Sequence, residues 1–359
     1  MREMKLRSTE RLQYIDIAKA ITIFLVVLGH PRAVEDYGEV ERFLYAFHMP
    51  LFFVMSGIFL KQKSYYSIQS WKAFFRKNLL GLFVPYIIWA AIYMPFTYIS
   101  VGKALYGSWI VLRNTQTLSS LWFLPVLFMA RTYQEAMMHI AWKFQWNPRK
   151  AAIVCAVLFF ILGMALPHNN TGDGIGMPWG FDIAFVASAF MLLGYLGRPC
   201  LEKLAVQGGI RNLVIAVVSL FLLLIGIRFT HYSEVHPFML MANAEFGSPI
   251  LCLINGITGS LMVIMTAQIA DRFLKYRSCI LYIGQNTMGI YLIHKTFLQG
   301  LYNMTINVAP GIPYLIRAVV VSCIAVIFSL LLMSVLGKYI SEILGRPPVV
   351  NNYEEKLME

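Results

Sequence analysis

The chain has 359 residues, of which 58% are hydrophobic and 13% are charged, and it carries a formal net charge of +12. An average soluble domain has about 25% charged residues, so this composition excludes an ordinary soluble globular protein. The 14% of aromatic residues excludes a disordered chain. The sequence therefore predicts an all-α fold, a polytopic helical bundle in a membrane.

Apolar runs follow one another along the whole chain. A bilayer core requires about 20 mostly apolar residues per helix. About ten such runs are present, and we expect transmembrane helices at residues 14–31, 43–60, 79–100, 121–141, 151–167, 181–197, 211–229, 249–270, 279–300 and 313–337. We assign residues 1–345 to one membrane domain and 346–359 to a short cytoplasmic polar tail. The first run lacks a small-residue cleavage site, so no cleavable signal peptide is expected.

The basic residues are divided unequally between the loops. If the N-terminus is cytoplasmic, 21 of the 30 Lys and Arg residues fall in inner segments and four fall in outer loops. Lys and Arg concentrate in cytoplasmic loops, so both termini are predicted to be cytoplasmic. This distribution also excludes a nucleic-acid partner, because the positive charge marks topology and not a binding face. The predicted partner is the lipid bilayer.

Cysteines and metal ligands give no recognisable site. The five cysteines lie in apolar runs or beside inner loops, with neither metal-ligand spacing nor a disulfide framework. The outer loop 230–249 contains His231, Glu234, His236 and Glu245, but their spacing fits no closed zinc site. We expect no metal.

The first span contains three polar residues on one face. Lys19 and His30 are eleven residues apart, about three helical turns and about 16 Å, and Asp16 lies three residues before Lys19. Ionisable residues within spans are costly and mark functional sites by default. Two interpretations stay open: an inner Asp16–Lys19 pair with a functional His30 near the outer end, or a helix-terminal acid, a snorkelling lysine and an interfacial histidine.

The second span has a similar polar pattern. His48 lies in its outer half, at about the depth of His30, and Ser56 is about 12 Å deeper. Pro50 can open the helix or only kink it, and Ser56 with Gly57 can form a packing contact. In the fourth span, Arg131 lies near mid-depth with Glu135 four residues later, and two interpretations stay open: an internal ion pair, or an arginine that lines a passage through the bundle.

Four ordered segments resemble a known family. They are the run from Tyr14 to Lys19 that continues to the Gly-His at 29–30, the run Phe-His-Met-Pro-Leu-Phe-Phe-Val-Met-Ser-Gly at 47–57, Leu-Trp-Phe-Leu at 121–124, and the run from Gly284 to His294. Together they resemble the acyltransferase 3 family of integral-membrane O-acyltransferases, and most closely its fucose 4-O-acetylase-like branch. Lys19 and His30 match a family pattern of a basic residue, ten intervening positions and a histidine; Lys keeps the charge of the more usual Arg without its planar fork.

The resemblance implies a reaction. An acyl group, usually acetyl, moves from cytoplasmic acyl-CoA to a sugar hydroxyl of a cell-surface polysaccharide or its lipid-linked precursor, in the bacterial plasma (inner) membrane. Acyl-CoA is a co-substrate, no bound cofactor is implied, and polysaccharide synthesis machinery is a potential partner.

The resemblance also suggests roles for individual residues. We expect His30 as general base, supported by Lys19 and Asp16, and acyl-CoA binding by Arg76, Lys77 and Arg131, whereas Lys61, Lys63 and Lys72 are expected only to mark the inner side. Oxyanion or acceptor contacts are expected from Ser56, Trp122, Asn286, His48 and His294. For the two histidines a second interpretation stays open: His294 either approaches His30 or is a structural hydrogen bonder, and the same applies to His48. Asp182 and Arg317 begin the sixth and tenth spans on the outer side, where acceptor hydroxyls would arrive.

Two alternatives remain at this stage. The first is a component that exports polysaccharide without acyl transfer, because transporters also contain several spans with internal charges. The second is an acyltransferase whose acceptor is a small molecule, an antibiotic or a lipid. A direct transfer is expected, because no Cys or Ser with an adjacent base stands out.

Overall fold

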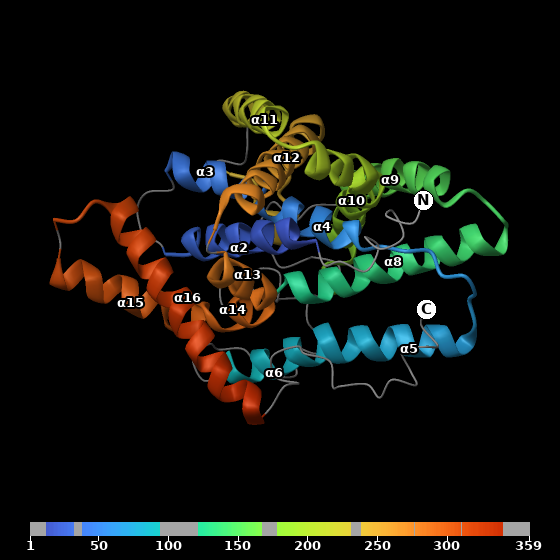
Figure 1. The fold of residues 1–359 in the computed structure, drawn as a ribbon. Helices are drawn as coiled ribbons and strands as arrows, with labels where there is room; N and C mark the ends of the chain where they lie inside the picture. The colour runs from blue at the N-terminus through green and yellow to red at the C-terminus, as the bar shows by residue number, and fades with distance from the viewer. Residues whose placement is uncertain are drawn as a thin grey trace.

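The computed structural model describes residues 12–31, 38–93, 121–166, 178–230, 238–275, 277–309 and 311–339. Within these ranges the regular structure is helical, apart from one isolated β-bridge between Leu240 and Glu245. Figure 1 shows long helices stacked in a bundle, with α15 and α16 at one edge. The expected tail 346–359 lies outside the described residues.

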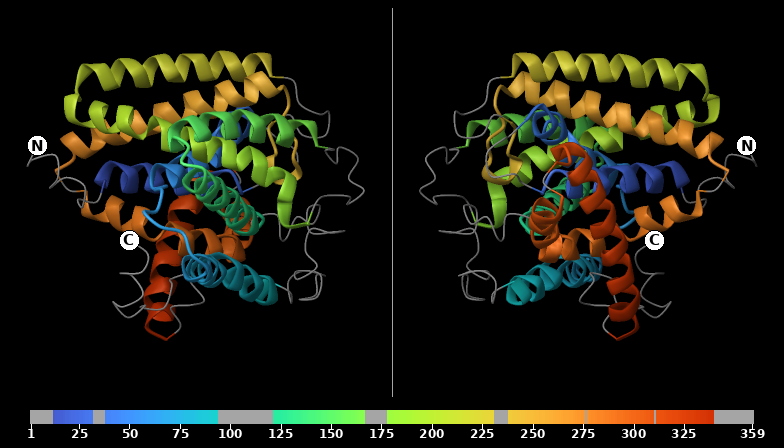
Figure 2. Two further views of the ribbon diagram at one scale, coloured as in Figure 1. Left: turned by 90° about the vertical axis from the view of Figure 1, so that its right-hand side faces the viewer. Right: turned by 90° about the vertical axis from the view of Figure 1, so that its left-hand side faces the viewer.

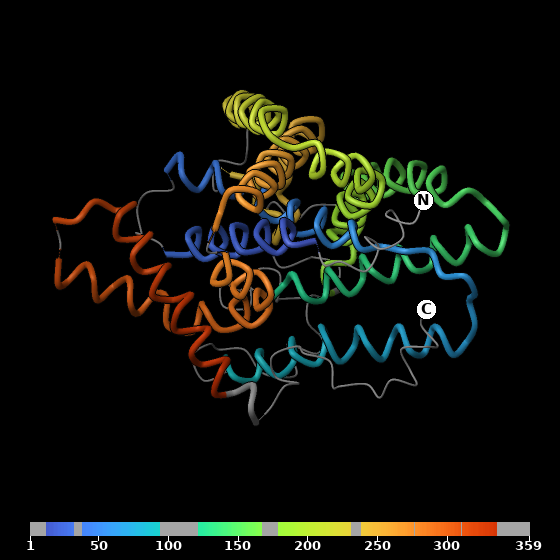
Figure 3. The backbone as a smooth tube through the Cα atoms, viewed as in Figure 1, coloured from blue at the N-terminus to red at the C-terminus, as the bar shows by residue number. Residues whose placement is uncertain are grey.

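The helices follow the order of the apolar runs. Their bounds are α2 Gln13–Leu28, α3 Glu39–Tyr45, α4 His48–Ile58, α5 Ile68–Asn78, η1 Leu79–Phe83, α6 Val84–Tyr93, α8 Phe123–Lys143, α9 Pro148–Ala165, η4 Pro178–Gly180, α10 Phe181–Gln207, α11 Ile210–Phe229, η5 Met241–Asn243, α12 Pro249–Phe273, α13 Ser278–Gln285, α14 Thr287–Ile293, α15 Lys295–Val308 and α16 Tyr314–Tyr339. The tube in Figure 3 shows successive long helices running back and forth.

Six helices are long and apolar enough to cross a membrane, within the described ranges: Ile68–Tyr93, Pro148–Ala165, Phe181–Gln207, Ile210–Phe229, Pro249–Phe273 and Tyr314–Val335. Exposed apolar side chains cover α9, α11 and α16, which face outward and contact lipid in a bilayer. Figure 2 shows α11 along one outer edge of the bundle.

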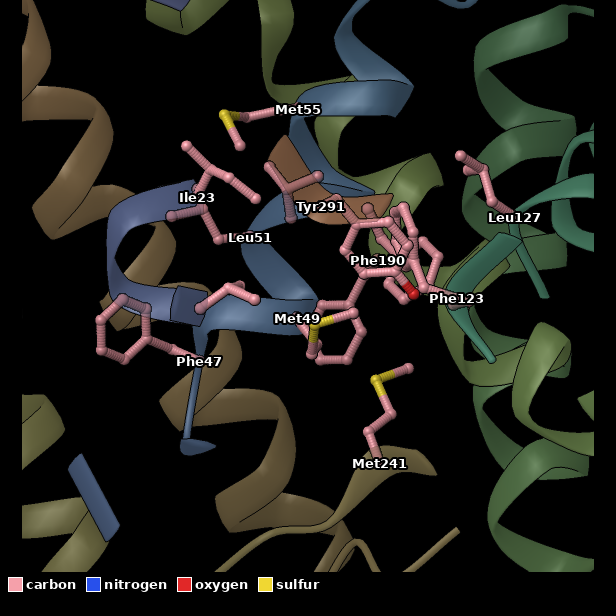
Figure 4. Close-up of a cluster of buried hydrophobic side chains, with 14 of the residues drawn as sticks. Ile23, Phe47, Met49, Leu51, Met55, Phe123, Leu127, Phe190, Met241 and Tyr291 are labelled. Atoms are coloured by element: carbon pink, nitrogen blue, oxygen red, sulfur yellow. The ribbon is translucent and has the colours of Figure 1, made fainter. Parts of the chain in front are cut away.

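Helices α2 and α4 form the centre of the bundle. Helix α4 packs directly on α10, because a Cβ on Gly57 would lie 1.7 Å from the Met191 carbonyl oxygen and one on Gly194 would lie 2.0 Å from that of Val54. Small residues allow helix backbones to approach closely in membranes. Figure 4 shows the buried apolar side chains that fill this centre, including Phe47.

Three of the expected spans differ from the observed helices. The run 43–60 is divided between α3 and α4, and the run 79–100 belongs to a helix that already begins at Ile68 and contains a π-helical turn, η1. The run 279–300 is divided into α13, α14 and α15, with breaks at Asn286 and His294. All five cysteines lie in the described ranges and are free.

Candidate functional site

Three histidines gather at one end of the bundle. His30 follows the end of α2, and its ring lies edge-on to that of His294, with centroids 5.0 Å apart and an interplanar angle of 71°. His48 is the first residue of α4, and the centroid of its ring lies 4.9 Å from that of the Tyr45 ring. The Tyr45 hydroxyl donates to the carbonyl oxygen of Gly29 at 3.1 Å, which links His48 to the end of α2.

Each histidine is held by its own segment of chain. A carbonyl oxygen can only accept, so each Nδ1 carries the hydrogen and each neutral ring keeps its lone pair on Nε2. This single tautomer leaves Nε2 as the base atom in all three rings. The Nδ1 distances are 2.6 Å from His30 to Val26 O, 2.5 Å from His48 to Leu44 O and 2.8 Å from His294 to Tyr291 O.

The two facing rings differ in their surroundings. His294 is fully buried, and its Nε2 has no hydrogen-bond partner among the described residues. His30 is partly exposed, and its side chain makes no further hydrogen bond within the described ranges.

A second tyrosine, Tyr314, makes hydrogen bonds at the histidine end of the bundle. The Tyr314 hydroxyl lies 3.1 Å from the Pro31 carbonyl oxygen, next to His30, and also contacts the buried carboxylate of Glu41. Sequence reasoning missed Tyr45, Glu41 and Tyr314. Their only sequence signal is a tyrosine or an acid beside an apolar run, which is too common to select them.

The opposite end of α2 contains the ion pair that the spacing predicts. Lys19 Nζ lies 3.7 Å from Asp16 Oδ1, and it also lies 5.1 Å from the centroid of the Phe59 ring. The Asp16 backbone touches Gly284 of α13, where a Cβ would lie 1.8 Å from the Asp16 carbonyl oxygen. Lys19 and His30 are about 16 Å apart along α2, so they act at different depths.

Arg131 does not pair with Glu135, so of the two interpretations of this arginine the i,i+4 ion pair is wrong. Arg131 Nη1 instead donates to Asn78 Oδ1 at 3.0 Å, from α8 to the end of α5. Asn78 directly follows Arg76 and Lys77, both exposed in the last turn of α5. The three expected acyl-CoA contacts therefore lie around one buried amide.

Glu135 has a partner that the sequence did not indicate. It forms an ion pair of 2.5 Å with Lys63, from the segment between α4 and α5. Tyr66 of the same segment stacks on His139 of α8 at 4.9 Å. Burial and then the nearby Glu135 carboxylate raise the pKa of Tyr66 to about 12. Lys63 is expected from the sequence only to mark the inner side, but its ion pair also holds its segment against α8.

The expected oxyanion donors lie at different depths. Ser56 donates to the Phe52 carbonyl oxygen at 2.9 Å, and Asn286 donates to that of Tyr282 at 2.7 Å. Each lies eight residues from a site histidine, about 12 Å along a helix. Trp122 precedes α8 at the histidine end, where its neighbour Phe123 contacts the ring of Tyr291.

The remaining candidates in the described ranges lie in helices that hold none of the three histidines. Asp182 is fully buried in the first turn of α10. The Arg317 guanidinium donates to the carbonyl oxygens of Ala309 and Ile312 at 3.0 Å each, which fastens the turn between α15 and α16. The described ranges contain no group of three His, Cys, Asp or Glu residues that could hold a metal ion. His231, Glu234 and His236 lie outside those ranges.

The fold and this histidine-centred site define a helical membrane protein with polar groups at both ends of its central helix. The family model described as an acyltransferase domain, that of the acyltransferase 3 family, matches residues 12–334. The chain therefore belongs to the acyltransferase 3 family and is a membrane acyltransferase. No curated protein and no solved structure matches it.

Proposed function

We propose that this protein is an O-acyltransferase of the fucose 4-O-acetylase-like branch, which moves an acetyl group from acyl-CoA to a sugar hydroxyl. The observation that carries the proposal is the contact between His30 and His294, because it fixes a ring with an uncommitted Nε2 at the end of the central helix. A general base must reach its proton within about 3 Å, and histidine has a suitable basicity near neutral pH.

The proposed topology has ten passes, with both termini cytoplasmic in a bacterial inner membrane. The passes are α2, the pair α3 and α4, the helix Ile68–Tyr93, α8, α9, α10, α11, α12, the chain of α13 to α15, and α16. Six of these helices, in the part of the chain that the structure describes, are long and apolar enough to cross a membrane by themselves. Support comes from the basic residues, which concentrate at the end of α2 that holds Lys19. His30, at the other end, then lies near the outer surface, where a cell-surface glycan or its lipid-linked precursor arrives.

Acyl-CoA approaches from the inner side in this proposal. Arg76 and Lys77 supply exposed positive charge for its phosphates, and Arg131 lies behind them in the bundle, held by Asn78. Lys19 and Asp16 lie in the inner half of α2, and their ion pair places charged groups beside the path by which acyl-CoA approaches. No resident cofactor is needed for this reaction.

The transfer step is direct. His30 Nε2 takes the proton from the acceptor hydroxyl as its oxygen attacks the thioester carbonyl carbon. A C–O ester bond forms, the C–S bond breaks, and the departing CoA sulfur receives the proton from His30. Trp122, at the same end, is our proposed donor to the developing oxyanion, since its indole N–H can only donate. His294 keeps the His30 ring in place, and His48 completes the acceptor side.

Mass spectrometry of the surface glycan tests the proposal. A strain that lacks this protein is compared with the same strain expressing the wild type or His30→Gln. We expect the ester to be lost, with polymer length and amount unchanged, and to be restored only by the wild type. Loss of the polymer itself would instead indicate an export component. An unchanged glycan would point to a small-molecule or lipid acceptor.

A further inference from the structure

A large cavity lies between α8 and α9, away from the histidines. Its volume is about 830 Å³, within the range of binding pockets for small molecules. Its deep wall is aromatic, since Tyr133 stacks on Phe185 at 4.9 Å and also contacts Phe159. Met137 and Cys155 continue the apolar lining. Nothing in the proposed transfer reaction uses this space.

The cavity opens toward the membrane. Ile140 and Val154 line it and are nevertheless 47% and 57% exposed. Val154 belongs to an exposed apolar face of α9 that continues through Val157 and Ile161. An apolar, exposed rim on a membrane-facing helix makes this side of the cavity accessible to lipid hydrocarbon.

One end of the cavity is polar and basic. Gln145, Trp146, Asn147 and Lys150 line it where α8 passes into α9. The Asn147 side chain accepts from the backbone N–H of Lys150 and caps α9. The Lys150 side chain is exposed and forms no ion pair with the described residues. A tryptophan and a lysine at one level are typical of the membrane interface.

The cavity also has the length of a lipid chain. Lys150 and Phe159 are nine residues apart on α9, about 14 Å. This is about half of the 30 Å hydrocarbon core, which is the depth of one leaflet. A ligand with an anionic head at Lys150 and a single apolar chain reaching Phe159 fits both ends.

We propose that the cavity between α8 and α9 binds an anionic phospholipid of the surrounding bilayer, with one acyl chain among Tyr133, Phe159 and Phe185 and its phosphate at Lys150. The bound lipid fills a space that would otherwise be empty and holds α9 against α8. It is a site separate from the transfer reaction, so it does not depend on the proposed function.

Native mass spectrometry of the purified protein tests the site. The protein, in a non-ionic detergent, is mixed with phosphatidylglycerol or with phosphatidylcholine. We expect one phosphatidylglycerol to be retained by the wild type in preference to phosphatidylcholine. Lys150→Gln should weaken this preference about fivefold, the factor expected for one lysine beside anionic lipid. Lys203→Gln, an exposed lysine at the same end of the bundle on α10, should leave it unchanged.

Filling the cavity provides the second variant. Val154→Trp should abolish retention of the lipid, while Val217→Trp should not, because Val217 is equally exposed at 57% but lies on α11, away from the cavity. Equal retention by the wild type and Val154→Trp would overturn the proposal. So would an unchanged lipid preference in Lys150→Gln, or retention of neither phospholipid by the wild type. If Val154→Trp does not fold, the Lys150→Gln result alone decides.

Discussion

The two ends of the central helix hold polar side chains in opposite ways. At one end, His30, His48 and His294 each donate to a backbone carbonyl of their own chain segment and leave Nε2 uncommitted. At the other end, side chains satisfy one another, as in the ion pairs of Lys19 with Asp16 and of Lys63 with Glu135. A group that must exchange a proton needs a free atom, whereas a group that fastens two helices needs a partner. The histidine end therefore has the free base atoms that the proposed function requires, and the other end has the paired side chains that fasten helices.

The largest effect is expected for His30→Ala. Removing the proposed base should lower the rate of acyl transfer by about 10²–10⁴-fold, the usual contribution of general-base catalysis. The half-buried ring makes one hydrogen bond within its own segment, so protein level in the membrane should be unchanged. Transfer of radiolabelled acetyl groups in membranes, normalised to protein, measures this. Wild-type activity in the variant would remove His30 from the mechanism.

A smaller effect is expected for His294→Ala. The variant keeps the base but loses the ring that lies edge-on to His30. A displacement of about 1 Å in a reacting group can cost about 10²-fold, so we expect a loss between tenfold and a hundredfold. The matched control is His139→Ala, a histidine stacked on Tyr66 at the opposite end, which should retain most activity. A larger loss in His294→Ala than in His30→Ala would reverse their roles.

At the opposite end, Glu135→Gln should lower the stability of the protein more than its rate of acyl transfer. It leaves Lys63 without its carboxylate, and a hydrogen bond to a charged group contributes about 1.5–3 kcal/mol. The midpoint of thermal unfolding in detergent should fall, and transfer at low temperature should fall less than in His294→Ala. The double variant Lys63→Met with Glu135→Leu should recover stability, because it removes both charges. If the double variant does not recover the unfolding midpoint, the loss of the ion pair is not the cause of the lower stability of Glu135→Gln.

The smallest effect is expected for Ser56→Ala. The Ser56 hydroxyl donates to the Phe52 carbonyl oxygen of its own helix and lies about 12 Å from the level of the histidines. Transfer should change less than twofold. A loss of tenfold or more would place Ser56 at the reacting atoms and would extend the site inward.

The sequence predicts much of this arrangement, because composition and charge act along the whole chain. The apolar runs indicate the helices and the i,i+3 spacing indicates the Asp16–Lys19 pair, whereas the sequence leaves His294 open between an approach to His30 and a structural hydrogen bond. Long-range pairing is not encoded in local spacing. Arg131 and Glu135 are neighbours on one helix, yet each bonds to a different segment.

The helix breaks were also not predictable from the sequence. Hydropathy is continuous across Asn286 and His294, and neither residue is a strong helix breaker. The breaks depend on packing, since Gly284 meets the Asp16 backbone and Gly289 meets Met333. The cavity between α8 and α9 is a similar case, because it exists only where two separate helices diverge.

The most direct test of the account uses sealed inside-out membrane vesicles, in which the cytoplasmic side faces the medium. Radiolabelled acetyl-CoA is added outside, and an acceptor oligosaccharide is enclosed in the lumen in one sample and added outside in a second. We predict labelled ester on the enclosed acceptor with the wild type and none with His30→Gln. Label on the enclosed acceptor at equal rates in both proteins, or only on acceptor added outside, would contradict a base at His30 near the outer surface.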